Sequence, residues 1–275
     1  MRLICSSRLF IISALVLLIS SNAPAQRPGR WMELPQMSRK QERKAYSLDM
    51  TVGGVHQRNY TFLWNEDHMT ADWVAYPLCK GNIGTGKRTN EFGLCPLLPY
   101  RRQPDLVHGY REGSGGWYSR GHQIPSADRL ERNANIQTFY GVNMTPQDEN
   151  LNGGIWASLE NKVRSWASRC DTLYVVSGCL YEDSYEGEYA LDNDGKRVDV
   201  PSSYYKALLF LKDGTYHACA FRFENRPYPS GKLSKDMAMS LSELEILTGI
   251  EFFPNLKPVL GAQRYMRIKE EIYYL

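Results

Sequence analysis

The chain of 275 residues lacks the sequence signatures of several common kinds of enzyme and scaffold. No G-x-S-x-G occurs, so a serine hydrolase of that type is not supported. No C-x-x-C occurs either, which argues against a structural zinc site. Internal repeats are absent, and beyond the N-terminal 25 residues no apolar run is long enough to span a bilayer. These absences favour a globular domain whose chemistry depends on residues spread along the chain.

Net charge gives little information about partners. The formal charge is +3, and Arg2 and Arg8 supply two of those charges from a segment that we expect to be removed. A nucleic-acid partner therefore cannot be argued from net charge alone. Positive residues are instead concentrated locally, at Lys87-Arg88, at Arg101-Arg102, and from Arg111 to Arg120.

The N-terminal segment has the pattern of a signal peptide. Arg2 and Arg8 form a positive region, residues 9–19 are apolar, and Ala23-Pro24-Ala25 is a cleavage signal. The apolar run is about half the roughly 20 residues that a spanning helix needs. We therefore predict an exported protein, periplasmic or extracellular, without membrane association after cleavage. The expected organisation is a signal peptide at 1–25, a poorly ordered lead-in at 26–50 and a single domain at 51–275.

The cysteine count constrains the disulfides. Export would leave five cysteines, an odd number that allows at most two bridges and one free thiol. Cys79 and Cys95 flank a glycine-rich loop and are the first pair expected. Pairing among Cys170, Cys179 and Cys219 stays open.

Residue patterns predict an α+β fold. Strands are expected at 60–64, 72–78, 137–143, 172–177, 204–211 and 216–223, with a hairpin turn at Asp213-Gly214. Helices are expected at 150–169 and at 240–248, the second with Ser240 as its N-cap. Residues 80–116 read as one long loop. This order of elements predicts a central, largely antiparallel sheet flanked by helices.

The stretch Ser119-Arg120-Gly121-His122-Gln123 carries the strongest chemical signal. An imidazole has a reference pKa of about 6.5, so His122 can act as a neutral base near neutral pH. The guanidinium of Arg120 can bind a phosphate through two parallel hydrogen bonds. The glycine between them permits a close backbone approach.

A second group of polar residues follows on the long predicted helix. Asn152, Trp156 and Glu160 recur at four-residue steps and share one helix face. Helical rise separates Asn152 from Glu160 by about 12 Å, too far for both to bind one ion directly. We expect Asn152 to bind a metal directly and Glu160 to hold a metal-bound water, which suits Mg²⁺ because this ion keeps most of its waters. Asn143, at the end of a predicted strand, is expected to orient His122 or to assist the metal shell.

Three separated segments together resemble a known family. Arg120-Gly121-His122-Gln123, Asn143-Met144-Thr145-Pro146-Gln147 and Leu151 to Glu160 resemble the DNA/RNA non-specific endonucleases, which are ββα-metal (His-Me finger) nucleases. The resemblance covers roughly residues 60–256. It implies a ββα-metal core, Mg²⁺ with Mn²⁺ as a possible substitute, and endonucleolytic cutting of DNA and RNA that leaves 5′-phosphates.

The resemblance also implies a role for each matching residue. His122 corresponds to the general base that activates water, and Asn152 to the direct metal ligand. Glu160 corresponds to the residue that holds a metal-bound water. Arg120 corresponds to a phosphate-binding residue, and Arg88 is the match for a second one in the early loop.

One position departs from the family pattern. The family's strongest form has Asp before Arg-Gly-His, where this chain has Ser119. Serine can hydrogen-bond but adds no charge, so we expect weaker metal binding or slower turnover. The alternative hypothesis is a nucleic-acid-binding module with weak or lost catalysis. The sequence makes no prediction of oligomeric state.

Overall fold

The computed structural model describes residues 31–37, 43–181 and 187–275. The predicted signal peptide at 1–25 lies outside these ranges. Across the three ranges, every helix is too short or too polar to cross a membrane.

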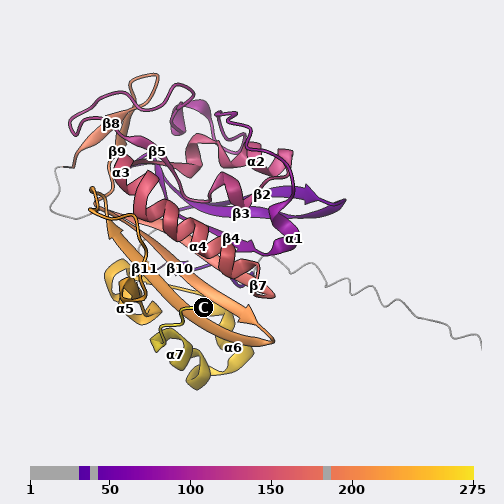
Figure 1. Ribbon diagram of the computed structural model, residues 1–275. Coiled ribbons are helices and arrows are strands. Elements are labelled where there is room, and N and C mark those ends of the chain that lie inside the picture. Colours follow the sequence, from indigo (N-terminus) through magenta and orange to yellow (C-terminus); the bar gives the residue numbers. More distant parts are fainter. Residues whose placement is uncertain (1–30, 38–42, 182–186) are drawn as a thin grey trace, which may run out of the picture.

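A seven-stranded antiparallel sheet forms the centre of the molecule (Figure 1). It combines strands from both ends of the described chain, in the spatial order β12-β11-β10-β7-β4-β3-β2. The fold is therefore α+β with a largely antiparallel sheet, as predicted. The strands are β2 (Ala45–Val52), β3 (Val55–Asn65), β4 (Thr70–Leu78), β7 (Thr172–Leu180), β10 (Ser203–Lys212), β11 (Thr215–Glu224) and β12 (Ala238–Met239).

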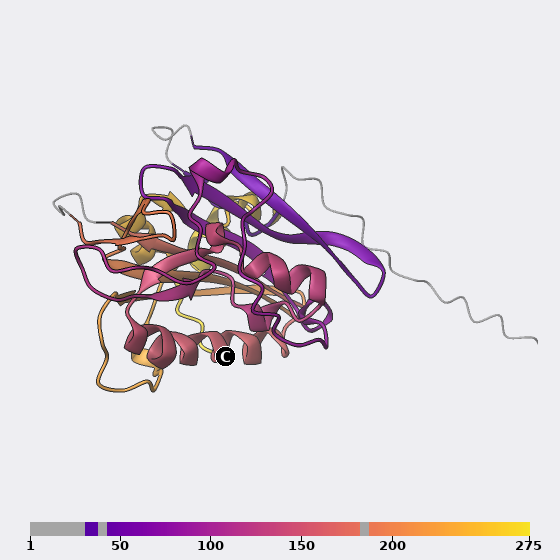
Figure 2. The same cartoon turned by 90° about the horizontal axis from the view of Figure 1, so that it is seen from above.

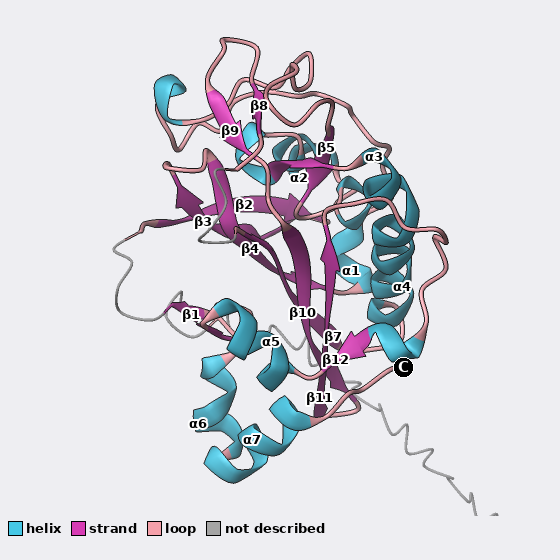
Figure 3. Cartoon of the chain, turned by 90° about the vertical axis from the view of Figure 1, so that its left-hand side faces the viewer, coloured by secondary structure: helices cyan, strands magenta, loops and turns pink. Residues whose placement is uncertain are grey.

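Alternating residues of the sheet enter two different cores. In β10, Leu208 and Phe210 pack on the face that also buries Leu159 and Trp166 of helix α4 (Ala157–Ala167). The intervening Leu209 packs on the opposite face. That face is covered by α5 (Leu241–Thr248) and α7 (Ala262–Glu270), which is joined to α5 through α6 (Lys257–Leu260). Figure 3 shows these two groups of helices on opposite sides of the strands, and Figure 2 shows α4 lying along its face.

A ββα unit lies at one end of the face that α4 covers. Strand β5 (Ser119–His122) pairs antiparallel with β6 (Met144–Gln147), and a nearly continuous helix follows. This helix comprises α3 (Glu149–Leu151), a π-helical segment (Asn152–Trp156) and α4. The Asp148 carboxylate caps its start by accepting from two backbone N–H groups. Gly154, with φ −102° and ψ −112°, takes up the irregularity that separates the first turns from α4.

The remaining elements are short. They are β1 (Gln36–Met37), which pairs with β13 (Ile250–Glu251), the hairpin of β8 (Tyr189–Leu191) and β9 (Arg197–Asp199), α1 (Lys80–Ile83), α2 (Arg132–Thr138), and 3₁₀ turns at Tyr100–Arg102, Ser126–Asp128, Gly141–Asn143, Lys235–Met237 and Pro254–Leu256. The helix predicted at 240–248 is confirmed with its capping box of Ser240 and Glu243. The 80–116 segment is irregular apart from α1 and one 3₁₀ turn, as expected.

The strand predicted at 137–143 is wrong. Those residues end α2 and then form a 3₁₀ turn, and the strand lies at β6 instead. β-Branched and aromatic residues such as Ile136 and Phe139 favour a strand locally. Tertiary contacts override that preference, because the buried Asn135 donates to the carbonyls of Ser126 and Arg129 and fixes the helical turn.

Two further predictions need correction. Residues 43–50 are not a disordered lead-in, because β2 starts at Ala45 and buries Leu48 and Met50. The expected disulfide between Cys79 and Cys95 is also wrong, since all five cysteines among the described residues are free thiols. The Gln103 side chain fixes the turn at residues 95–98, by accepting from the Cys95 N–H and donating to the Cys95 and Leu98 carbonyls.

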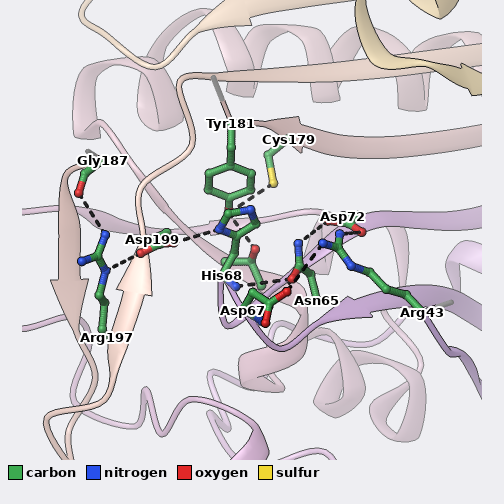
Figure 4. Close-up of polar contacts among 11 residues, drawn as sticks. Arg43, Asn65, Asp67, His68, Asp72, Cys179, Tyr181, Gly187, Arg197 and Asp199 are labelled. Carbon is green, nitrogen blue, oxygen red and sulfur yellow. Dashed lines mark hydrogen bonds and ion pairs between the residues drawn. The ribbon is translucent and has the colours of Figure 1, made fainter. Parts of the chain in front are cut away.

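A polar cluster joins the β3–β4 turn to the β8–β9 hairpin (Figure 4). The His68 ring stacks on Tyr181 at 3.9 Å, and its Nδ1 lies 2.8 Å from a carboxylate oxygen of Asp199. Asn65 donates to Asp72, whose carboxylate also pairs with Arg43. His68 therefore has a structural role, in agreement with its having received no catalytic assignment from the sequence.

Candidate active site

An open cavity of about 440 Å³ lies where the ββα unit meets the 88–92 loop. Five of the six residues predicted for the site line it, namely Arg88, Arg120, His122, Asn152 and Glu160. They come from three segments distant in sequence. The fold therefore brings together one imidazole, two guanidinium groups, one carboxamide and one carboxylate.

His122 lines the cavity, and one of its ring nitrogens has no hydrogen-bond partner in the described part of the chain. Nε2 is buried and has no hydrogen-bond partner among the described residues. The ring instead donates to the backbone of Arg120, which assigns that proton to Nδ1. Phe139 lies edge-on to the ring at 5.2 Å between centroids. Burial, and next the positive charge of Arg88, lower the pKa of His122 to about 3, so the imidazole is neutral.

The two arginines are held in place by aromatic rings and fixed acceptors. Arg120 and His122 occupy alternate positions of β5 and so face the same side. The Arg120 guanidinium lies 3.4 Å from the Phe92 ring centroid and donates to the Leu106 carbonyl at 2.7 Å. Arg88 stacks on Phe139 and donates to Ser126 Oγ at 2.7 Å. Burial lowers the pKa of both guanidinium groups, but from so high a value that both remain charged.

The side chains of Asn152 and Glu160 provide oxygen atoms that could bind a metal and that make no hydrogen bond or ion pair with other described residues. Both side chains are half-buried at the cavity. Burial is the main cause that raises the pKa of Glu160 to about 7, and Lys206 opposes it. Hard oxygen ligands in an open cavity fit a divalent cation that keeps several waters, such as Mg²⁺. The donor set therefore fits the metal that the family resemblance implies.

Sequence reasoning missed Arg164, which also lines the cavity. Its guanidinium donates to Asp128 at 2.9 Å, and Asp128 accepts as well from the hydroxyl of the buried Tyr76. Arg164 follows Glu160 by four residues, so it continues the helix face that carries Asn152. That spacing was the available signal.

Asn143 does not reach the cavity. It is fully buried, accepts from the Ile124 N–H at 3.0 Å, and donates to the Ile124 and Thr138 carbonyls. Its amide is occupied by backbone groups, so the predicted part in a metal shell is wrong. The amide instead holds the backbone of Ile124, two residues after His122, and that it orients His122 stays a prediction.

Gly121 is required for the close packing of β5 on β6. A Cβ atom at this position would lie 2.4 Å from Oε1 and 2.7 Å from Cβ of the buried Gln147. Neither distance is possible without displacing one strand from the other. Any such shift would move the neighbouring His122.

We predict that Gly121→Ala lowers both stability and turnover. The expected loss in the free energy of unfolding is about 1–3 kcal/mol, from overpacking. Denaturant unfolding measures it, with Gly93→Ala as the matched control because a Cβ there meets nothing within 4 Å. Equal unfolding midpoints for the two variants would contradict the packing argument.

Comparisons with known proteins agree with this geometry. The model of the DNA/RNA non-specific endonuclease family matches residues 39–259. The chain belongs to this family. Its relatives are nucleases, and the chain is assigned to the nucleic-acid hydrolases.

Individual relatives support the same assignment. The chain is 31% identical over 218 residues to a nuclease of Nostoc sp., covering 74% of this chain and 73% of that protein. It is 30% identical to a nuclease of Serratia marcescens, covering 72% and 73% respectively. It is 28% identical to the mitochondrial nuclease EXOG of Homo sapiens, covering 72% of this chain but only 56% of that protein.

A solved structure shows the same fold. A structure of the EndoG/EndoGI complex matches with a TM-score of 0.58 and 21% identity, covering 71% of this chain and 83% of that chain. The ββα-metal nuclease fold expected from the sequence is confirmed.

Proposed function

We propose that the protein is an exported, Mg²⁺-dependent endonuclease that hydrolyses phosphodiester bonds of DNA and RNA and leaves 5′-phosphates. One observation carries this proposal: His122, whose Nε2 has no hydrogen-bond partner among the described residues, lines the same cavity as the unpaired side chains of Asn152 and Glu160. A base and metal-binding oxygens are the groups that phosphodiester hydrolysis requires.

His122 is the proposed general base. Its neutral Nε2 accepts a proton from a water aligned with the scissile P–O bond, while the Nδ1 hydrogen bond to Arg120 holds the ring in the required tautomer. Burial, and next the positive charge of Arg88, lower the basicity of the ring. A bound phosphate counters the charge of Arg88 and so raises the pKa of His122.

Asn152 would hold the metal directly, and Glu160 would hold it through water. The Mg²⁺ held there, or Mn²⁺ in its place, would supply positive charge against the negative charge that develops on the phosphate and on the leaving oxygen. The described lining offers one carboxylate and two carboxamides, and the Asn161 oxygen already accepts from Arg164, so most of the coordination shell is left to water and substrate.

Arg88 and Arg120 would bind the scissile phosphate. Both are already oriented by aromatic stacking and by hydrogen bonds to fixed acceptors. Contacts to phosphate carry no sequence information, so the cutting should be insensitive to sequence and should weaken as salt increases.

Export is proposed from the N-terminal pattern alone. Residues 1–25 combine a positive region, an apolar run and an A-x-A cleavage signal. Detection of the processed chain outside the cytoplasm, with a mature N-terminus near Gln26, would test it.

The function is tested by incubating the mature protein with plasmid DNA and with RNA, with Mg²⁺ and with a chelator. Degradation of both substrates only in the presence of metal supports the endonuclease. Gel retardation without cutting supports the alternative, a nucleic-acid-binding module with weak or lost catalysis. Intact substrates with no retardation would contradict both.

Ser119 stands where the family's strongest form has Asp, and substitution of this residue tests what the difference does. Ser119 lines the cavity, so Ser119→Asp would add a carboxylate to the cavity that Asn152 and Glu160 also line. We predict that the Mg²⁺ concentration for half-maximal activity falls roughly tenfold, because an added negative charge at short range attracts the cation. Ser119→Asn has similar size to the aspartate and no charge, and it serves as the control. An unchanged Mg²⁺ dependence in Ser119→Asp would show that this position does not act on the metal.

A further inference from the structure

A buried ammonium group lies beneath the candidate site. Lys206 belongs to β10, in the interior of the sheet, and has no exposed surface. Burial of an unpaired ammonium costs several kcal/mol. The other buried lysine among the described residues, Lys269, has an ion pair with Glu245, whereas Lys206 has no carboxylate within ion-pair distance. Other contacts of Lys206 must therefore offset the free-energy cost of burying its ammonium group.

The hydrogen bonds of Lys206 are directed to the residue that follows His122. Nζ donates to the Gln123 carbonyl at 3.2 Å and to Ser177 Oγ at 3.0 Å. The Ser177 hydroxyl in turn donates to Gln123 Oε1 at 2.9 Å. Lys206 thus fixes Gln123 twice, directly at its backbone and through Ser177 at its side chain. Ser177 is also the cross-strand partner of Lys206 between β7 and β10.

The same ammonium group contacts the helix that carries the metal-binding oxygens. Nζ lies 4.6 Å from the ring centroid of Trp156, a favourable cation–π distance. Trp156 lies four residues after Asn152 and four before Glu160. The charge of Lys206 also attracts that of Glu160 on this helix face, and Figure 3 shows α4 packed beside β10.

We propose that Lys206 is a positioning residue, which sets the distance between the strand that carries His122 and the helix that carries Asn152 and Glu160. Among the described residues, only the Lys206 side chain both donates to the Gln123 carbonyl and lies over the Trp156 ring. The catalytic part of this inference rests on the proposed function. The geometric part concerns only the placement of His122.

The test compares Lys206→Met with Lys269→Met. Methionine keeps an unbranched apolar stem but removes the charge and all three donors. Lys269→Met removes a buried lysine that lies on the opposite, α5–α7 side of the sheet, so it controls for lost stability alone. We expect Lys206→Met to lower kcat roughly 10- to 100-fold, because misplacement by about 1 Å has an effect of this size, while KM for DNA stays nearly constant. Lys206→Arg, which keeps a cation and donors, should recover part of that loss.

A second readout does not depend on turnover. The ring signals of His122 in a ¹H–¹³C correlation spectrum, assigned with His122→Gln, should shift in Lys206→Met and stay in place in Lys269→Met. Calorimetric titration with Mn²⁺ should show weaker binding in Lys206→Met as the helix moves away from the strand. If Lys206→Met does not fold, Ser177→Ala removes only the relay to the Gln123 side chain and should shift the same signals with a smaller loss of kcat.

The outcomes separate this inference from the proposed function. A folded Lys206→Met, or Ser177→Ala in its place, with wild-type kcat and unshifted His122 signals would overturn the positioning role. Loss of kcat no greater than that of Lys269→Met at equal thermal stability would overturn it too. If the wild-type protein does not cut nucleic acid, the proposed function fails, and the His122 signals still decide the geometric part.

Discussion

Replacing His122 with alanine is expected to lower kcat on plasmid DNA by roughly 10²- to 10⁴-fold, the usual contribution of a positioned general base. Nε2 of this residue is the unpartnered ring nitrogen at the cavity, and alanine leaves no group to accept the proton of the attacking water. Binding of DNA should be retained, because Arg88 and Arg120 remain. The measurement is single-turnover cleavage together with a binding titration in chelator.

Two controls make the His122 result specific. His56→Ala removes an exposed imidazole from the β2–β3 hairpin and should leave kcat unchanged. Imidazole added to the buffer should restore part of the activity of His122→Ala, because a small base can occupy the vacated space. Cleavage by His122→Ala at the wild-type rate would rule out the proposed mechanism.

Replacing Asn152 with alanine is expected to lower kcat by roughly 10²- to 10⁴-fold at saturating Mg²⁺, since charge stabilisation by the ion is worth several kcal/mol. The Asn152 side chain makes no hydrogen bond to any described residue, so its loss removes no structural contact. Calorimetric titration with Mn²⁺ should show the binding isotherm reduced or lost. Asn152→Asp keeps an oxygen ligand and should retain more binding than alanine does.

Asn150→Ala is the matched control for this variant. Asn150 carries the same amide two residues earlier in the helix and is exposed to solvent. It should bind Mn²⁺ and cut DNA as the wild-type protein does. Wild-type Mn²⁺ affinity in Asn152→Ala would place the metal elsewhere.

The elements with strong local signals could be predicted from the sequence. The capping box of Ser240 and Glu243 fixes where α5 begins, and the apolar stripe at 155, 159, 163 and 166 fixes which face of α4 is buried. Each of these signals lies within one element. The segment 137–143 was predicted wrongly because its helical form depends on Asn135, whose partners come from the preceding turn.

Some residues of the candidate site could likewise be predicted from local sequence patterns, whereas others depend on contacts between distant segments. The spacing of Asn152 and Glu160 on one helix face is a local pattern, and it predicted residues that do meet in the cavity. Arg88 reaches the cavity because an irregular loop brings it there. The hydrogen bond from Arg88 to Ser126 fixes the position of that loop. Asn143 has the residue type of a ligand, but only the fold shows that backbone groups occupy its amide.

Lys206 illustrates a signal that was present but not used. Alternation along β10 places it on the same face as Tyr204, Leu208 and Phe210, so the sequence alone assigns this lysine to a buried position. What it contacts there depends on the long-range packing of α4 and β5 against the sheet. Such contacts between distant segments have no local sequence pattern.

The central claim is that the ββα unit holds one divalent cation between His122 and the helix that carries Asn152 and Glu160. The most direct measurement is an anomalous difference map from crystals of the wild-type protein grown with Mn²⁺. The account predicts a single peak in the cavity at about 2.1 Å from Oδ1 of Asn152, with a water between the ion and the Glu160 carboxylate. A cavity without a peak in crystals of protein that cuts DNA in the same Mn²⁺ concentration, or a peak bound to other residues, would contradict it.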